Sequence, residues 1–164
     1  MPNWCEGTLK VRGKFEDVKK FCKENFQVWE SRFDTENGRW QEVINEKAIT
    51  IETDDEECFW MRIDNTAYIK GTHRNFIESN SIEFYPGDDG NTVAAMAFKA
   101  AWWIKAEPYV EMAKQYSVDI RIYGFEMGME FNQEIIIENG NLIKDEEIKF
   151  SDYTWECPMP LLGG

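Results

Sequence analysis

Three stretches of this chain alternate apolar and polar residues with a period of two, and this pattern constrains the fold more than any other feature. The alternation runs through residues 7–13 (GTLKVRG), 94–103 (AAMAFKAAWW) and 118–126 (VDIRIYGFE). A period of two is typical of a strand with one buried and one exposed face. The three stretches therefore predict strands of a sheet that has an apolar side.

Two amphipathic segments each follow one of these strands. In residues 14–26 (KFEDVKKFCKENF), apolar side chains recur near a 3.6-residue period, and two acidic residues occupy the first turn, where the helix dipole favours anions. After Pro108, which the first turn of a helix accepts, Tyr109, Met112 and Tyr116 recur at helical spacing. A strand–helix–strand unit is thus expected near each end of the chain.

Turn signals predict further strands. Asn37-Gly38 lies between two aromatic-rich runs, Asn139-Gly140 predicts a second hairpin, and an Asn-Gly pair suits a type I′ turn. Residues 48–53, 58–63 and 81–86 are typical of strands. The expected fold class is α+β: a ferredoxin-like split βαβ antiparallel sheet, with two helices on one face and additional β-hairpins.

The length of 164 residues fits one domain of ordinary size. We expect a single domain over residues 1–164, with inserted hairpins at about 27–92 and a C-terminal hairpin and tail at about 127–164. Trp4 and Cys5 are expected to dock on the core. The tail CPMPLLGG is expected to lie over the surface, and its end, Gly163-Gly164, is interpreted as flexible rather than as the diglycine of a ubiquitin-like modifier.

Acidic residues outnumber basic ones by 31 to 18, and the formal net charge is -13. A field of this sign repels nucleic acid and anionic membranes and attracts basic partners. Neither direct nucleic-acid binding nor a membrane partner is therefore expected. Acidity also keeps a protein soluble, so charge alone does not define a partner.

The cysteines and the N-terminus indicate a compartment. Cys5, Cys22, Cys58 and Cys157 form no C-x-x-C pair and no evident disulfide framework. No basic-then-apolar leader is present, and no apolar run approaches the roughly 18 residues that span a bilayer. A reduced, cytoplasmic protein is expected.

No motif of a known catalytic or metal site is present. The chain lacks G-x-S-x-G, a P-loop and G-x-G-x-x-G. His73 is the only histidine, and it lies in a locally basic stretch from Lys70 to Arg74 that we interpret as pairing with carboxylates; a zinc site is improbable. The acidic runs lack EF-hand spacing. We therefore expect no enzymatic activity, no cofactor and no metal, with an enzyme that uses His73 as a remaining alternative.

Longer motifs resemble a known family. The start MPNWCEGTLKVRG, the segment AFKAAWWIKAEPYVEMAKQYSVDIRIYGFE and the following MGMEF are similar to the YubB-type ferredoxin-like domain family, over roughly half the chain. The matching positions are Trp102, Pro108, Tyr123, Glu126, Gly128 and Phe131. The segment from Trp103 to Pro108 departs from the Gly-Pro-Pro type of turn in the family. The resemblance implies a ferredoxin-like fold and an origin in phages, conjugative plasmids or integrative elements, and hence a bacterial host cell.

Carboxylates recur in clusters and at strand spacing. Residues two apart on a strand point the same way, about 6.6 to 6.8 Å apart, so evenly spaced carboxylates can present a row of negative charge. Such a row can imitate the phosphate track that a basic groove grips. The candidate partner-binding residues are Asp54, Asp55, Glu56, Glu57, Asp88, Asp89, Glu126, Glu130, Glu134, Asp145, Glu146 and Glu147.

These observations lead to one functional hypothesis and one alternative. The hypothesis is a non-enzymatic acidic binding protein of a mobile genetic element. It would inhibit a host defence or nucleic-acid-handling protein, such as a nuclease, by occupying its basic surface, with exposed aromatic residues as anchors. The alternative is a small structural or self-assembling domain, without an inhibitory role, that uses free sheet edges for contacts.

Overall fold

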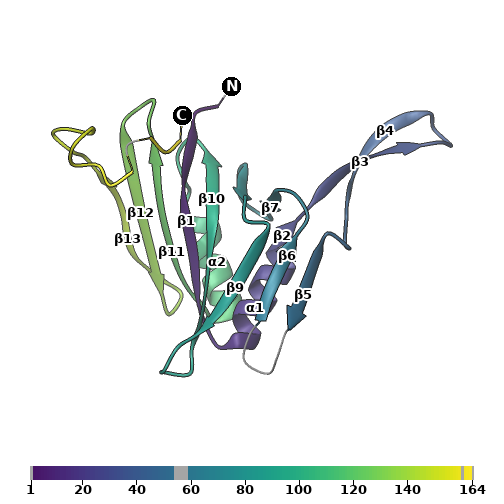
Figure 1. Cartoon of the computed structure of the whole chain (residues 1–164), viewed down its shortest axis with the longest axis horizontal. Coiled ribbons are helices and arrows are strands. Elements are labelled where there is room, and N and C mark those ends of the chain that lie inside the picture. Colours follow the sequence, from purple (N-terminus) through teal and green to yellow (C-terminus); the bar gives the residue numbers. More distant parts are fainter. Residues whose placement is uncertain (1, 54–58, 160, 164) are drawn as a thin grey trace.

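Antiparallel strands dominate the computed structural model, which describes residues 2–53, 59–159 and 161–163 (Figure 1). The strands are β1 (Trp4–Gly13), β2 (Phe26–Gln27), β3 (Trp29–Asp34), β4 (Arg39–Ile44), β5 (Ile49–Thr53), β6 (Phe59–Ile63), β7 (Ala67–Ile69), β8 (Asn75–Ile77), β9 (Ser81–Pro86), β10 (Thr92–Ala101), β11 (Asp119–Glu126), β12 (Phe131–Glu138) and β13 (Asn141–Ile148). The helices are α1 (Phe15–Asn25) and α2 (Glu107–Tyr116). Both helices lie where the amphipathic pattern predicts them.

The prediction of a ferredoxin-like split βαβ sheet with two helices on one face is wrong. In the described part of the chain, strands make up 51% and helices 14%, and a single sheet joins eleven strands. Of the inserted strands, β5 to β9 are part of this sheet, whereas β3 and β4 form a two-stranded sheet of their own. The physical reason is the length of β10, which pairs with β1 along one edge and with both β8 and β9 along the other.

The middle of the sheet consists of β1 between β10 and β11, antiparallel to both. On β1, Leu9 and Val11 are buried toward the helices, while Lys10 and Arg12 face the opposite, open side. At Gly7 a side chain is impossible, because an added Cβ would lie 1.9 Å from the carbonyl oxygen of Tyr123 on β11. The predicted alternation of β1 is therefore confirmed.

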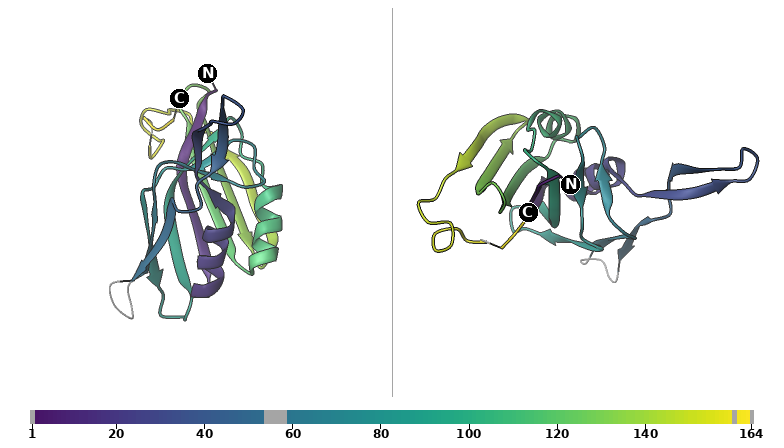
Figure 2. Two further views of the ribbon diagram at one scale, coloured as in Figure 1. Left: turned by 90° about the vertical axis from the view of Figure 1, so that its right-hand side faces the viewer. Right: turned by 90° about the horizontal axis from the view of Figure 1, so that it is seen from above.

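Two helices complete the core. α1 contacts β1 and β10, α2 contacts β11 and β12, and the helices also contact each other (Figure 2). Phe21 of α1 and Tyr109 of α2 are fully buried, and Tyr109 accepts a hydrogen bond from the amide of Asn75 at 2.8 Å. Burial raises the pKa of the Cys5 thiol to about 12, with Glu126 and Glu6 contributing in the same direction, so Cys5 stays protonated at neutral pH.

The sheet divides at β10 into two branches. One continues through β8, β7 and β2, and the other through β9, β6 and β5. The second branch covers the start of α1, where the ring of Phe15 lies 4.3 Å from that of Phe59 and 5.8 Å from that of Phe84. The strand predicted over residues 94–103 ends earlier: β10 stops at Ala101, and Trp102 follows it with φ at 65° and is exposed.

Both predicted hairpins are present, with different turns. Asn139 and Gly140 both have positive φ, as a type I′ turn requires, between β12 and β13. Between β3 and β4 only Gly38 has positive φ, and its N–H bonds the carbonyl of Asp34. The β3–β4 hairpin therefore has a longer turn than the two-residue type I′ turn that was predicted. In the described residues, no helix is long and apolar enough to cross a membrane.

Candidate protein-binding site

The β3–β4 hairpin forms a sheet of its own and projects from the rest of the molecule (Figures 1 and 2). Its strands pair in register from Trp29 with Ile44 to Asp34 with Arg39. An isolated two-stranded hairpin is only marginally stable in water. Its shape therefore depends on contacts within the hairpin.

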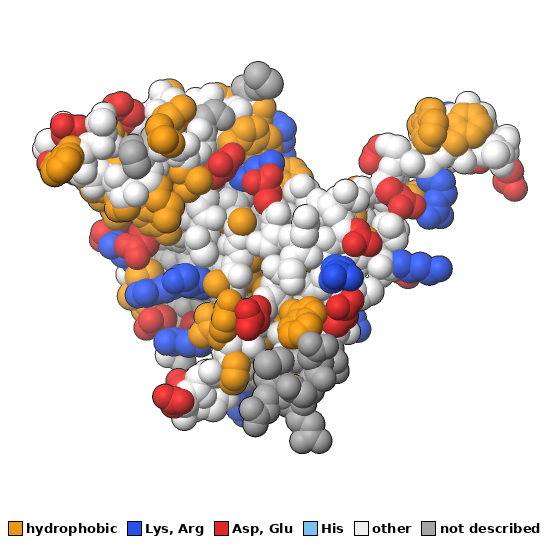
Figure 3. Space-filling view, viewed as in Figure 1, with side chains coloured by type: hydrophobic (Ala, Val, Ile, Leu, Met, Phe, Trp, Pro, Cys, Tyr) orange, Lys and Arg blue, Asp and Glu red, His pale blue; other side chains and the backbone are white. Residues whose placement is uncertain are grey.

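One side of this hairpin carries four exposed apolar side chains, with Ser31 and Glu42 between them. Trp29, Phe33, Trp40 and Ile44 alternate onto the same side of the two strands and are 47%, 46%, 69% and 42% exposed. Phe33 pairs with Trp40, and their rings meet edge to face at 5.4 Å. We call this surface the aromatic face; Figure 3 shows hydrophobic side chains gathered at the projecting end. Large aromatic side chains left in solvent on a projecting element are the kind that anchor interfaces.

The other side of the hairpin is polar and satisfied internally. Arg32 forms an ion pair with Glu30 at 2.5 Å, and the amide of Asn45 donates to Glu30 at 2.8 Å. The amide of Gln41 donates to Asp34. Several polar groups on this side thus have partners within or beside the hairpin, and the large exposed apolar side chains lie on the aromatic face.

The turn of the hairpin is closed by Asp34. Its carboxylate accepts the backbone N–H groups of Glu36 and Asn37 at 2.9 and 3.1 Å, and the side-chain amide of Asn37 at 2.5 Å. The hydrogen bonds from Asn37, side chain first, lower the pKa of Asp34 below its ordinary value. Asp34 is therefore ionised at neutral pH and adds a negative charge beside the aromatic face.

The predicted acidic residues lie in three separate places. Asp88 and Asp89 are in the turn between β9 and β10; Glu126 and Glu130 flank the turn between β11 and β12; Glu134, Asp145, Glu146 and Glu147 are on β12 and β13. Asp54, Asp55, Glu56 and Glu57 lie outside the described residues. The structure brings the third group together on neighbouring strands and leaves Asp88 and Asp89 apart from it (Figure 1).

Most of these carboxylates already have partners. Lys144 contacts Glu134 at 2.7 Å and Glu146 at 3.4 Å, and Lys149 contacts Glu147 at 3.4 Å. The amide of Gln133 donates to Asp145 at 2.8 Å. Two lysines thus offset part of the charge of these four carboxylates, which lowers the negative potential that the group presents.

Glu126 is buried and holds the turn that follows β11. It is fully buried, and its carboxylate accepts the backbone N–H groups of Gly128 and Met129 at 2.8 and 2.5 Å. These bonds order the turn that leads into β12. A buried carboxylate of this kind presents no charge to a partner.

The basic stretch around His73 forms the loop between β7 and β8. Its Arg74 lies over the ring of Trp4 at 5.5 Å, and Lys99 approaches the same ring at 5.1 Å. Trp4 also meets Phe76 edge to face, so it is a half-buried part of the open sheet face. In the described residues, no group of three potential metal ligands is present.

Sequence reasoning located the hairpin but not its exposed residues. The Asn-Gly pair and the two aromatic-rich runs predict the hairpin, and the alternation of WESRF puts Trp29 and Phe33 on one side. A buried strand has the same alternation. Only the three-dimensional arrangement shows that, among the described residues, no other element covers this side.

Comparisons with protein-family models, curated proteins and solved structures found no match for this chain. The resemblance to the YubB-type family therefore rests on the quoted residues alone.

Proposed function

We propose that this chain is a non-enzymatic binding protein that docks on a basic surface of another protein through the aromatic face of the β3–β4 hairpin. The observation that carries the proposal is the exposure of Trp29, Phe33, Trp40 and Ile44 on one side of a projecting ribbon. A few aromatic side chains at the centre of an interface commonly contribute most of the binding energy. Burying these residues on a partner would also order the hairpin.

Charge indicates the chemistry of the partner. The net charge of -13 favours association with basic surfaces, and such steering acts on on-rate and orientation. Glu42 lies within the aromatic face, between Trp40 and Ile44 on the strand, and accepts a hydrogen bond from Ser31. A carboxylate among aromatic rings suits a partner arginine, which pairs with carboxylates and stacks on aromatic faces.

The resemblance to proteins of mobile elements narrows the class of partner. A host defence or nucleic-acid-handling protein has a basic surface for phosphates, and an acidic protein bound there would block it. Inhibition by occupying that surface is the activity that we propose.

The test is capture of partners from a bacterial lysate by the immobilised full chain. Trp40→Ser should lose the partner, while Trp155→Ser, which alters a Trp that is 87% exposed outside the hairpin, should retain it. Capture should weaken strongly at about 0.5 M salt, because surface charges are then screened. The proposal is wrong if capture is unchanged by Trp40→Ser, or if it is insensitive to salt.

Self-assembly is a second candidate, which one observation favours. β13 is an edge strand of the eleven-stranded sheet, and its Leu142 and Ile143 are 46% and 61% exposed. A free edge with exposed apolar residues is a template for pairing with another copy. A mass measured by light scattering that doubles with concentration, and returns to the monomer value in Ile143→Lys, would favour this candidate.

A further inference from the structure

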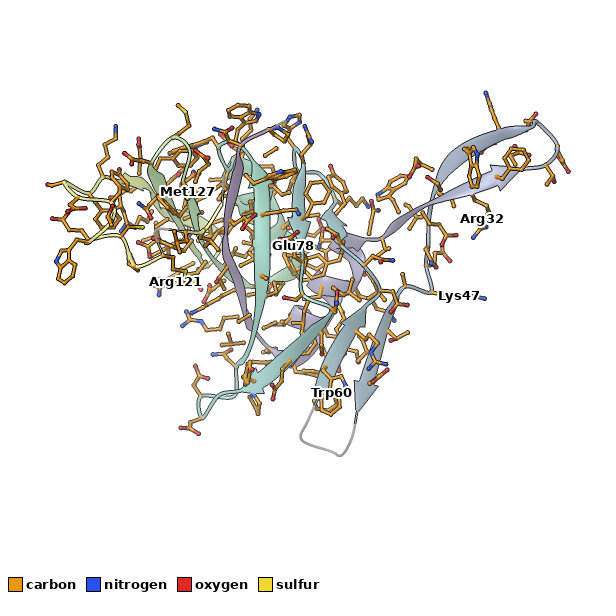
Figure 4. All side chains as sticks on the ribbon, turned by 45° about the horizontal axis from the view of Figure 1, so that its top comes forward. Arg32, Lys47, Trp60, Glu78, Arg121 and Met127 are labelled. Carbon is orange, nitrogen blue, oxygen red and sulfur yellow. The ribbon has the colours of Figure 1, made fainter. Side chains whose placement is uncertain are left out.

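One end of the main sheet carries large apolar side chains in solvent. Two loops meet at this end: the segment that follows β10 and the turn that joins β11 to β12 (Figure 1). The exposed fractions are 50% and 45% for Trp102 and Trp103, and 44% and 64% for Met127 and Met129. We call these four residues the Trp–Met patch; Figure 4, in which the top of Figure 1 comes forward, labels Met127.

Three contacts join the two loops. The ring of Trp103 lies 5.7 Å from that of Phe131, which directly follows the turn. The backbone N–H of Trp102 donates to the carbonyl of Asn3 at 2.9 Å. The side-chain amide nitrogen of the same Asn3 lies 3.3 Å from where a Cβ on Gly128 would be. Asn3 therefore bridges the segment after β10 and the turn, and the exposed side chains of both loops form one surface.

Buried polar side chains hold both loops in place. Gln133 is fully buried, its amide donates to the carbonyl of Ile104 at 2.8 Å, and its oxygen accepts the N–H of Ile104 at 2.9 Å. The buried carboxylate of Glu126 accepts two N–H groups of the turn, including that of Met129. A surface that is already ordered loses little conformational entropy when it binds. The Trp–Met patch is therefore preorganised.

The backbone around the patch is strained. Apart from glycine, φ is positive at six residues of the described chain, and three of them, Arg74, Trp102 and Glu130, lie at this end. Arg74 belongs here because its carbonyl accepts the N–H of Ala101, the last residue of β10, at 3.1 Å. A bulky residue in the left-handed region costs conformational energy, and such strain gathers at functional positions. The fold therefore holds Trp102 in solvent at a cost, which indicates a role for this surface.

The charges at the rim of the patch are balanced and unpaired. Arg74 adjoins the end of β10, Lys105 and Glu107 follow Trp103, and Glu130 ends the turn; these two cations and two carboxylates are all exposed. Within the described residues none of the four forms an ion pair. A strongly basic or strongly acidic partner would meet as many like charges as opposite ones. A second copy presents the same two signs, and a two-fold interface makes every contact between opposite charges twice.

We propose that the Trp–Met patch is the interface of a two-fold dimer of this chain. A Trp side chain buries up to about 250 Å², so the two indoles leave roughly 240 Å² in solvent, and the methionines add to this area. Apolar patches of about 300–600 Å² are the largest on a typical monomer and are often functional. With its charged rim, a patch of this size fits the apolar core of an interface that buries about 800 Å² per copy. Trp and Met are both enriched at interfaces.

The salt dependence of this dimer follows from its charges. Each copy has a net charge of -13, so two copies repel each other, whereas the patch itself is apolar. Salt screens the repulsion between exposed charges and leaves the burial of apolar area in place. Pairs of charges at a rim set orientation more than affinity. Dimerisation should therefore strengthen with salt, whereas docking of the aromatic face on a basic partner should weaken.

The experiment is sedimentation velocity of the full chain at about 1–500 μM, in about 0.05 and 0.5 M NaCl. The mass should rise with concentration from 19.3 kDa toward twice that value, and it should rise at lower protein concentration in the higher salt. Trp103→Ser and Met129→Ser should each weaken the dimer about tenfold or more. Three control variants alter exposed residues elsewhere and should leave the dimer unchanged: Trp155→Ser in the tail, Trp40→Ser in the aromatic face and Ile143→Lys on β13.

Charge reversal tests the two-fold arrangement without altering the apolar core. Glu130→Lys leaves three cations and one carboxylate at the rim, and Lys105→Glu leaves the reverse. At low salt, an equimolar mixture of the two variants should dimerise more tightly than either variant alone, because the two rims then carry opposite charges.

Five results would each overturn the proposal. They are monomers throughout the concentration range, a dimer unaffected by both Trp103→Ser and Met129→Ser, a dimer that Trp40→Ser or Ile143→Lys abolishes, a dimer that salt weakens, and a mixture no tighter than its separate variants. The interface shares no residue with the aromatic face, so capture of a basic partner can fail while the dimer forms, and the reverse.

Discussion

Phe33 and Trp40 face each other across the β3–β4 ladder, with their ring centroids 5.4 Å apart in an edge-to-face arrangement. Such pairs contribute about 0.5–1.5 kcal/mol beyond the burial of area. This contact therefore stabilises a hairpin that has no strand of the main sheet beside it. The rings that hold the hairpin in shape are also the rings that it presents to solvent, so structure and proposed binding depend on the same residues.

Trp40→Ala should loosen the hairpin and leave the rest of the molecule intact. The substitution removes the ring pair, and the hairpin forms no ladder with the eleven-stranded sheet. Amide hydrogen exchange should therefore accelerate over residues 29–44, with unchanged protection in β1, β10 and β11. Trp155→Ala is the control. A loss of protection throughout the main sheet would show that the hairpin is coupled to the core.

Asn37→Ala should raise the pKa of Asp34 toward its ordinary value of about 3.9. The Asn37 side chain is the largest cause of the lowered pKa. A carboxyl group with a lowered folded pKa stabilises the fold above its unfolded pKa and loses that contribution as the pH falls through the folded value. NMR titration of the Asp34 carboxyl carbon in both proteins measures the difference. Identical titration curves would assign the shift to another cause.

The local sequence pattern predicts the helices and many of the strands better than it predicts how the strands are ordered in the sheet. The helix expected over residues 14–26 is α1 (Phe15–Asn25), because its spacing and first-turn acids are local signals. The sequence contains no local signal for the branching of the sheet at β10. β7 and β8 are three residues long, too short to show an alternation. They pair with each other and join the rest of the sheet through β2 and β10, which are distant in sequence.

The candidate sites differ in how far the sequence could reveal them. The aromatic face follows from alternation on two runs next to an Asn-Gly pair, but its exposure depends on what the rest of the chain leaves uncovered. The facing of Lys10 and Arg121 on the open side of the sheet depends on the register of β1 against β11, since the two residues are far apart in sequence. The sequence likewise does not show that the acidic groups lie apart, because their positions depend on the turns between the strands. Nor does it show that Glu126 is buried, with its carboxylate bonded to the turn that follows β11.

Glu126→Gln should destabilise the protein by about 1–3 kcal/mol, because the buried carboxylate accepts two backbone N–H groups and an amide offers a single acceptor oxygen. The midpoint of urea unfolding measures the change. Glu130→Gln, at an exposed position of the same turn, is the control and should be nearly neutral. Equal midpoints for both variants would mean that the buried bonds contribute no stability.

Two successive charged rungs on the open face of the β1–β11 ladder should respond to charge removal with opposite changes in stability. Arg12→Gln removes an ion pair with Asp119 whose side chains are 50% and 27% exposed, and it should cost about 0.2–1 kcal/mol after solvent screening. Lys10→Gln removes a like-charge contact with Arg121, and it should stabilise the protein by about 0.2–1 kcal/mol. Urea midpoints at low ionic strength measure both, and both differences should shrink as salt is added. If Lys10→Gln destabilises the protein, then the two cations are already compensated in the folded chain.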